Sequence, residues 1–168
     1  MIVVLRWGHR AIRDERITSH VCLVARAFGA DKVIVSGENA GSAIKTVRKI
    51  SKNWGGSFEI EHRKDWKKVL QEHKGRTVHL TMYGEHIQDR MKEIRKHKDL
   101  LIIVGSQKVP PDIYQQATYN IAITNQPHSE VSSLAIFMHE YFQGKELENE
   151  FPNAKVRIKP NPKGKSFL

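Results

Sequence analysis

The stretch "NIAITNQPHSEVSSLAIF", residues 120–137, decides the fold because it reads as a buried strand, a polar loop and the start of a helix. Its first part belongs to the apolar run "YNIAIT" at residues 119–124. Its second part opens an apolar stripe at helical spacing, which ends near Gly144. The residues of that stripe are Val131, Leu134, Ala135, Met138, Tyr141 and Phe142. A strand followed at once by an amphipathic helix is the repeating unit of a parallel α/β sheet.

The same alternation of apolar runs and helical periods extends through the rest of the chain. Further strands are predicted at residues 2–6, 32–36, 57–62, 77–82 and 100–105. Between these runs, apolar residues recur at helical spacing. They are Ile44, Val47 and Ile50, then Trp66, Val69 and Leu70, then Ile87, Met91 and Ile94. We therefore expect the α/β class, with a mostly parallel sheet flanked by helices.

The size and charge of the chain narrow the possibilities. With 168 residues, 39% of them hydrophobic, it is long enough for one ordinary domain and short for two. We expect a single domain over residues 1–150, followed by a basic extension over residues 151–168. The formal net charge of +10 favours a polyanionic partner, nucleic acid first. The basic tail suits phosphate contacts, although a frayed solvated end has the same composition.

The chain shows no sign of a membrane segment. It contains no run of about eighteen apolar residues, and the apolar stretch within residues 1–10 is too short for a signal peptide. We expect a soluble, cytoplasmic protein. Because Cys22 is the single cysteine, a disulfide framework is impossible, and its apolar surroundings predict a buried thiol. No metal site of the cysteine and histidine type is expected.

Two nucleotide-binding motifs and one hydrolytic arrangement can be excluded. The fingerprint G-x-G-x-x-G is absent after the first strand, and so is the pattern G-x-x-x-x-G-K-[ST]. His128, Ser129 and Glu130 have the side chains of a hydrolytic triad, but they are consecutive. Neighbouring side chains point apart, so they cannot hydrogen-bond in series. A G-x-S-x-G nucleophile elbow is also missing.

Three loops indicate a ligand crevice. They follow apolar strands, carry glycine or proline, and cover residues 81–85, 104–111 and 124–130. In parallel sheets, ligands bind beyond the carboxyl ends of the strands, where glycine allows the backbone to approach closely. In any one loop, Gly84 or Gly105 could instead only permit a turn. Three such loops in succession favour a binding site.

These segments resemble the SPOUT family of RNA methyltransferases, in particular its 2'-O-ribose branch. The resemblance rests on "ARAFGADKVIV" at residues 25–35, "LLIIVGSQKVP" at residues 100–110 and the stretch at residues 120–137. It implies a C-terminal trefoil knot that binds S-adenosylmethionine.

Four further segments are similar to an archaeal family within this branch, which methylates cytidine 56 of tRNA. They are residues 5–21, 53–56, 79–84 and 124–135. The likeness extends from about Leu5 to Leu147.

The resemblance implies a cofactor pocket built from the three loops, largely through backbone groups. The residues that it assigns to the cofactor are Leu80, Gly105, Ser106, Gln107, Lys108, Val109, Ile123, Thr124, Asn125, Gln126, Pro127, His128, Ser129 and Glu130. The sulfonium of the cofactor is cationic, so Glu130 could offset that charge. Glu130 could equally cap the last helix near its N-terminus.

The sequence departs from the 2'-O branch in its first motif. Leu23 stands where the branch has an arginine, and Ile17 where it has an asparagine. The catalytic role must then pass to another residue, and we expect Arg16, just before a helix, with Arg10 and His20 as alternates. Arginine hardly deprotonates in proteins, so a clamp on the adjacent phosphate and the developing oxyanion is preferred over a general base.

Other readings of these residues stay open. Arg16 could form a surface ion pair with Asp14 or Glu15. Gln107 stands where the branch usually has glutamate, and Glu130 where it has asparagine, which weakens the transfer of roles from distant relatives.

The resemblance also implies partners. It predicts tRNA as substrate and a homodimer in which first-motif residues of one protomer approach the cofactor of the other. Phe137, Met138, Tyr141 and Phe142 could belong to that interface or to the core of the monomer. Two alternatives remain for the function: methylation of another tRNA or rRNA position, or RNA binding without catalysis.

Overall fold

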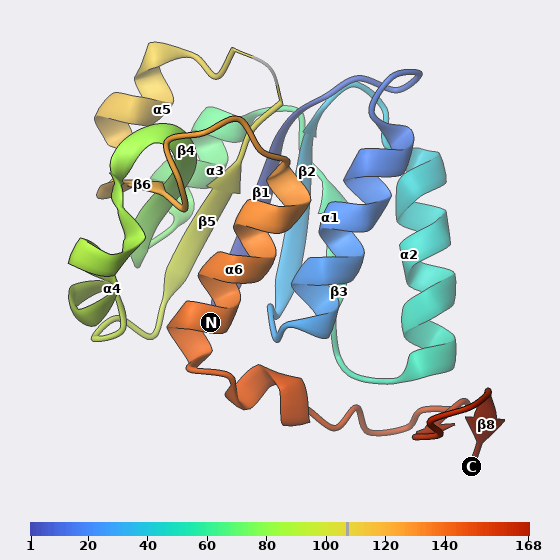
Figure 1. The fold of residues 1–168 in the computed structure, drawn as a ribbon. Helices are drawn as coiled ribbons and strands as arrows, with labels where there is room; N and C mark the ends of the chain where they lie inside the picture. Colours follow the sequence, from blue (N-terminus) through green and yellow to red (C-terminus); the bar gives the residue numbers. More distant parts are fainter. Residues whose placement is uncertain (107) are drawn as a thin grey trace.

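The computed structural model describes residues 1–106 and 108–168. A parallel six-stranded sheet in the order β3-β2-β1-β5-β4-β6 forms its centre, with helices on both faces (Figure 1). The strands of this sheet are β1 (Ile2–His9), β2 (Lys32–Gly37), β3 (Glu59–His62), β4 (Arg76–His86), β5 (Leu100–Val104) and β6 (Tyr119–Ala122). The helices are α1 (Glu15–Ala27), α2 (Gly41–Trp54), α3 (Trp66–Glu72), α4 (Ile87–Ile94), α5 (Pro111–Gln116), α6 (Glu130–Phe142) and the 3₁₀ helix η1 (Lys145–Glu148).

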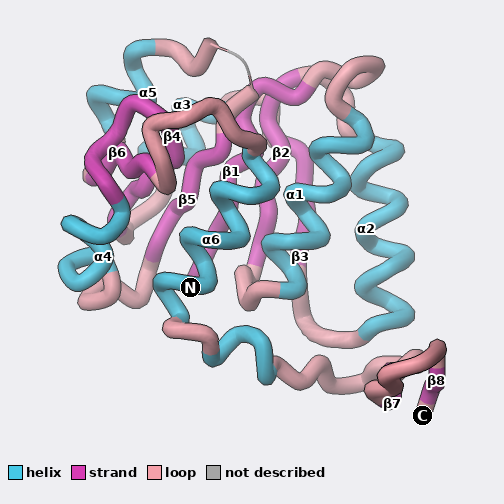
Figure 2. Tube along the Cα trace, viewed as in Figure 1, coloured by secondary structure: helices cyan, strands magenta, loops and turns pink. Residues whose placement is uncertain are grey.

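The alternation of side chains along the strands explains why helices cover both faces. Val4 of β1 and Ile102 of β5 belong to the core beneath α1, α2, α4 and α6, whereas their neighbours Leu5 and Ile103 face α3 and α5. Residues 2–5 of β1 and 100–104 of β5 are therefore continuously apolar, as expected for a parallel sheet buried on two sides. Figure 2 shows these two helical layers around the strands.

The order of the strands creates a crevice between β1 and β5. From β1 the chain continues through α1 on one face of the sheet, and from β5 it continues through α5 on the other face. Connections that leave neighbouring strands towards opposite faces open a gap outside the carboxyl ends of those strands. The fold thus prepares a ligand site at this edge, at the top of Figure 1.

The pairing of β4 with β6 is irregular at the same edge. Ile121 of β6 is in register with Leu80 and again with Glu85, so the segment between these two residues leaves the ladder. That segment is part of one of the three loops singled out by the sequence. The trefoil knot expected from the resemblance stays a prediction.

The sequence-based predictions of the strands and of α2, α3, α4 and α6 are confirmed. Differences occur at the ends and in short elements. Arg16 lies inside the first turn of α1, which begins at Glu15, rather than just before a helix. The short helix α5 was not expected, because Pro110 and Pro111 pointed to a loop; proline is tolerated in a first helical turn, where no amide hydrogen is needed.

The C-terminal segment is more ordered than its composition suggested. It ends in a small antiparallel pair, β7 (Ile158–Lys159) and β8 (Ser166–Phe167). The backbone amide of Lys155 donates to the carbonyl of Asn53 at 2.8 Å, and that of Gly56 donates to Pro152 at 2.8 Å. These bonds anchor the segment beside the end of α2, at the opposite end of the sheet from the crevice (Figure 1).

The burial of Cys22 agrees with the prediction from the sequence, and burial also decides between the two roles considered for Phe137 and Met138. Cys22 is fully buried in α1, and burial raises the pKa of its thiol to about 12. Phe137 and Met138 of α6 are also fully buried, so they belong to the core of the monomer. Among the described helices, none is long and apolar enough to cross a membrane.

The burial of Phe137 gives a first prediction. We expect Phe137→Ala to lower the free energy of unfolding by about 3–5 kcal/mol, because the cavity it leaves lies between α6 and the sheet. Leu147 of η1 is 66% exposed, and Leu147→Ala is the control, with an expected loss below about 1 kcal/mol. Urea unfolding followed by circular dichroism measures both; equal losses would show that Phe137 is not a core residue.

Candidate functional site

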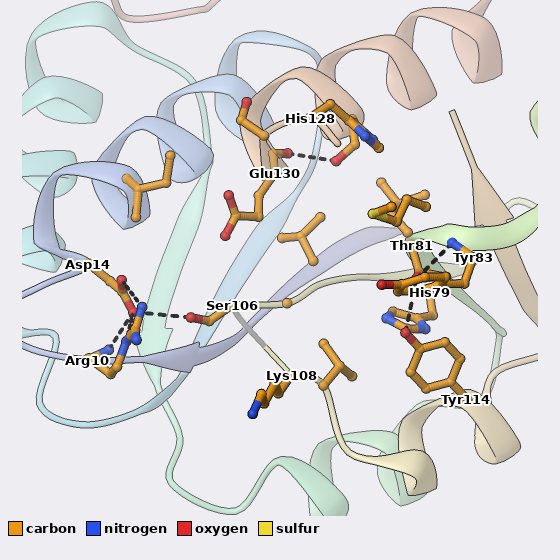
Figure 3. Close-up of a pocket in the computed structure, with 18 of the residues that line it drawn as sticks. Arg10, Asp14, His79, Thr81, Tyr83, Ser106, Lys108, Tyr114, His128 and Glu130 are labelled. Carbon is orange, nitrogen blue, oxygen red and sulfur yellow. Dashed lines mark hydrogen bonds and ion pairs between the residues drawn. The ribbon is translucent and has the colours of Figure 1, made fainter. Parts of the chain in front are cut away.

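A pocket of about 810 Å³ lies at the carboxyl edge of the sheet, in the crevice between β1 and β5 (Figure 3). Four segments converge on it: the β1–α1 loop, the end of β4, the β5–α5 loop and the start of α6. Its lining residues are Arg10, Arg13, Asp14, Ile17, His79, Leu80, Thr81, Met82, Tyr83, Val104, Gly105, Ser106, Lys108, Val109, Tyr114, His128, Ser129, Glu130 and Ser133. The mixture of apolar, polar and charged side chains suits a ligand with all three kinds of group.

The β5–α5 loop is held tightly against itself and against β1. A Cβ atom on Gly105 would lie 2.1 Å from Cγ2 of Val109, so glycine lets this side chain pack closely against the loop. The amide of Ser106 donates to the carbonyl of Trp7 at 3.1 Å. Gly8 follows with a φ of +76° and leaves room for the side chain of Ser106. These contacts bring the ends of β1 and β5 together on one side of the pocket.

An ion pair stabilises the β1–α1 loop. Nε and Nη2 of Arg10 each donate to a carboxylate oxygen of Asp14 at 2.8 Å, and Asp14 is almost completely buried. The Ser106 hydroxyl donates to the same carboxylate at 3.4 Å (Figure 3). The hydrogen bonds from Arg10 hold the pKa of Asp14 at about 2. Asp14 therefore stays ionised and links the loop to the β5–α5 segment.

The opposite wall contains a buried histidine. Nδ1 of His79 lies 2.9 Å from Oδ1 of Asn120, whose Nδ2 donates to the carbonyl of Tyr114 at 2.9 Å. This network assigns the proton of His79 to Nδ1 and leaves Nε2 as an acceptor. Burial lowers the pKa of His79, so the ring is neutral. Thr81 Oγ1 lies 3.1 Å from the hydroxyl of Tyr114, which completes this wall (Figure 3).

The start of α6 shows which residue caps the helix and where the side chain of Glu130 lies. Ser129 is the N-cap residue, since its hydroxyl accepts a hydrogen bond from the amide of Ser132 at 3.2 Å. Glu130 lines the pocket instead, and its Oε1 lies 3.7 Å from Nη2 of Arg6. The hydrogen-bonded cap is therefore Ser129, while Glu130 stands in the first turn of α6 and also lines the pocket.

The structure brings many of the residues expected to bind a cofactor to one pocket. Those that line it are Leu80, Gly105, Ser106, Lys108, Val109, His128, Ser129 and Glu130. Residues 123–127 are not among the lining residues, but two of them contact residues that are. Asn125 donates to the carbonyl of Met82 at 2.6 Å, and the carbonyl of Gln126 lies 2.7 Å from Nδ1 of His128. Gln107 lies outside the described residues.

The three candidates for catalysis occupy different places. Arg10 lines the pocket, whereas Arg16 and His20 are exposed on α1 and do not line it. Neither acid considered as a partner of Arg16 is paired with it within residues 1–106 and 108–168. Asp14 binds Arg10, and Oε1 of Glu15 accepts from the hydroxyl of Ser42 at 2.5 Å.

Sequence reasoning missed several residues of the site, among them the lining residues Asp14, His79 and Tyr114 and the buried Arg6 beside Glu130. For two of them a signal existed. Arg6 and His79 are polar residues inside the apolar runs at residues 2–6 and 77–82, and both are fully buried. A buried polar group requires partners, so its position in a core strand marks a place where polar groups gather.

Comparison with known proteins gives consistent results. A family model described as tRNA ribose 2'-O-methyltransferase, aTrm56, matches residues 54–168. The tRNA (cytidine(56)-2'-O)-methyltransferase of Thermococcus kodakarensis is 52% identical over 174 residues, which cover 100% of this chain and 97% of the relative. The protein of the same name from Methanocaldococcus jannaschii is 48% identical over 173 residues, covering 100% and 96%.

Solved structures share the fold at low identity. The SpoU methyltransferase AviRb from Streptomyces viridochromogenes, in complex with AdoMet, has a TM-score of 0.62 at 12% identity and covers 86% of this chain and 57% of that chain. A TrmH/SpoU tRNA modifying enzyme from A. aeolicus has a TM-score of 0.61 at 17% identity, covering 88% and 76%. The expected SPOUT-type α/β fold is therefore confirmed.

The Asp14 ion pair predicts a pH dependence of stability. Because its folded pKa of about 2 is below the usual value of 3.8, Asp14 adds stability above about pH 4, which is lost as the pH falls towards 2. We expect the free energy of unfolding of Asp14→Asn to be lower by about 2 kcal/mol at pH 6, and the difference to shrink near pH 2. Urea unfolding from pH 2 to 6 measures it. Asp89→Asn, at an exposed acid of α4, is the control; a difference for Asp14→Asn that does not depend on pH would contradict the assignment.

Proposed function

Because this chain belongs to the aTrm56 family of tRNA ribose 2'-O-methyltransferases, we propose that the pocket between β1 and β5 is where it methylates the 2'-hydroxyl of cytidine 56 in tRNA. S-adenosylmethionine is the methyl donor of this family. The observation that carries the choice of site is the convergence of four strand-end segments on this one pocket. Its position, at the point where the chain leaves β1 and β5 towards opposite faces, is where α/β sheets bind ligands.

The residues of the pocket fit the donor. Its volume of about 810 Å³ lies in the range of ligand sites. Nε2 of the buried His79 has no partner within the described residues and can accept a hydrogen bond from a bound ligand. Leu80 and Val109 offer apolar surface, while the polypeptide around Gly105 and residues 128–130 offers backbone groups. We propose that these residues hold the donor, which supplies a methyl carbon activated by a sulfonium.

For the transfer itself we propose Arg16 as the clamp. Nucleophilic attack by the 2'-oxygen develops charge that a nearby cation stabilises, and the protein contributes position and electrostatics. Two charge-assisted bonds to Asp14 already occupy the guanidinium of Arg10, which makes it the weaker candidate. Arg16 is exposed; in the sequence it directly precedes Ile17 and follows Arg13 by three residues, and both of these line the pocket. His20 remains an alternate on the same helix.

A homodimer would allow Arg16 to act, and we propose one. Arg16 does not line the pocket of its own chain, so it would serve the pocket of the partner subunit. Ile12, at the tip of the β1–α1 loop, is 99% exposed, and Ile136 of α6 is 44% exposed. Apolar residues at such positions favour a protein interface. We also propose that the enzyme works in the cytoplasm, with its tRNA substrate.

The tRNA would bind through positive charge around the pocket. Arg13 and Lys108 line the pocket beside Arg10, and the whole chain carries a net charge of +10. Such side chains position a folded RNA by contacting its phosphates, and tertiary shape selects the nucleotide.

A transfer assay tests the function. With tritiated S-adenosylmethionine and an unmodified archaeal tRNA transcript, we expect label in the ribose of cytidine 56. A matched transcript with 2'-deoxycytidine at position 56 should stay unlabelled, because the accepting hydroxyl is missing. Label elsewhere in the first transcript would favour another RNA position, and tight tRNA binding without donor binding would favour the non-catalytic alternative.

Mixed dimers test Arg16. We expect Arg16→Ala to reduce turnover at least about 100-fold with nearly unchanged donor affinity, since it acts on the transition state. We expect Gly105→Ala to weaken donor binding strongly enough to inactivate its pocket, because the added Cβ would displace the lining side chain of Val109. Co-expressed with different tags and purified as a mixed dimer, the two inactive chains should regain activity, as one pocket then has both an intact loop and an intact Arg16. Inactive mixed dimers would mean that Arg16 does not act on the partner's pocket.

A further inference from the structure

Arg6 is an unusual residue for a central strand. Its side chain is fully buried beneath α1 and α6, although it carries a guanidinium. Nη1 donates to the carbonyl of Trp7 at 2.9 Å. Nε and Nη2 have no hydrogen-bond partner in the part of the chain that the structure describes. A buried charge of this kind is costly unless a charged partner offsets it.

The nearest carboxylate belongs to the pocket. Oε1 of Glu130 lies 3.7 Å from Nη2 of Arg6, and the side chain of Glu130 is 30% exposed. Glu130 thus stands between a buried cation on one side and the pocket on the other. The distance corresponds to charge attraction without a direct hydrogen bond, so the carboxylate oxygens keep capacity for a ligand.

Most charged groups around the pocket are positive, and Glu130 differs from them in sign. Arg10, Arg13 and Lys108 line it, and the N-terminus of α6 adds a partial positive charge. Of its two lining carboxylates, Asp14 is bound by two hydrogen bonds from Arg10. Glu130 is therefore the lining carboxylate left to meet a positively charged ligand.

We propose that Arg6 is a positioning residue, which holds the carboxylate of Glu130 at the pocket so that Glu130 stabilises the positive sulfonium of the donor in preference to the neutral product. This inference rests on the proposed function. During transfer the 2'-oxygen forms a bond to the methyl carbon, the carbon–sulfur bond breaks with its electrons remaining on sulfur, and the hydroxyl proton leaves to solvent. The sulfur is then neutral, and Glu130 loses its partner, which favours product release.

Binding measurements separate donor from product. Isothermal titration of the full chain with S-adenosylmethionine and with S-adenosylhomocysteine gives two dissociation constants and their ratio. For Glu130→Gln we expect donor affinity to fall about tenfold while product affinity changes less than about twofold, the loss typical of one charge-assisted contact. Equal losses for both ligands would overturn the inference, because Glu130 would then meet the ammonium group that they share.

Variants of Arg6 test the positioning role. The preference for the donor is the ratio of the product and donor dissociation constants. We expect Arg6→Met to lower this ratio to nearly the value of Glu130→Gln. Arg6→Lys keeps the positive charge and should therefore keep part of the preference. When Arg6→Met is added to Glu130→Gln, the ratio should equal that of Glu130→Gln alone, because Arg6 acts through the carboxylate that is already missing. An unchanged or increased preference in Arg6→Met alone would overturn the positioning role.

If Arg6→Met folds poorly, the coupling between Arg6 and Glu130 can be tested by measuring unfolding temperatures instead. The double variant Arg6→Met with Glu130→Met removes both charges, and replacing both members of an ion pair by apolar residues is often neutral or stabilising, whereas leaving one member unpaired is destabilising. We expect it to unfold at a higher temperature than Arg6→Met alone; additive effects of the two substitutions would mean that the residues are not coupled. If the unaltered chain bound no donor, the proposed function itself would fail, whereas donor binding with an unchanged ratio in Glu130→Gln would overturn only this inference.

Discussion

The parallel pairing of β1 with β5 is the constraint on which the rest of the structure depends. Residues 2–6 pair in register with residues 100–104, and both segments are buried on both faces. Each fully buried aliphatic side chain contributes about 1.5–3 kcal/mol, so this pair forms the most strongly specified part of the sheet. Because α1 and α5 leave these strands towards opposite faces, the crevice follows from the same pairing. The core and the site thus share one origin.

Three of the buried polar side chains lie at the crevice, whereas the buried charged side chains Arg26 and Glu146 lie elsewhere in the fold. Arg6, Asp14 and His79 are each exposed by less than a tenth, and each contacts a loop that forms the pocket. Buried polar groups tolerate few alternative partners, so they fix the positions of the loops more sharply than apolar contacts would. A pocket whose loops are held in this way needs little rearrangement to receive a ligand.

Much of this could be predicted from the sequence, and the limits have physical reasons. The strands and the long helices were visible because apolar residues recur with a period of two or 3.6. The short helix α5 was missed because six residues carry too little periodic signal. Gly105 and Ser129 could be assigned to the site from their loops, but Asp14 could not, because its importance depends on a hydrogen bond to Ser106, ninety-two residues away.

The sequence by itself determined the α/β class, the positions of the site loops and the family, since these depend on local periodicity and on motifs. Only the tertiary structure decided which of the residues in those loops face the pocket. It separated Arg10, which lines the pocket, from Arg16 and His20, and it assigned the hydrogen-bonded cap of α6 to Ser129 while placing Glu130 at the pocket beside Arg6. The physical reason is that the direction of a side chain depends on partners distant in sequence, and a local pattern contains no information about them.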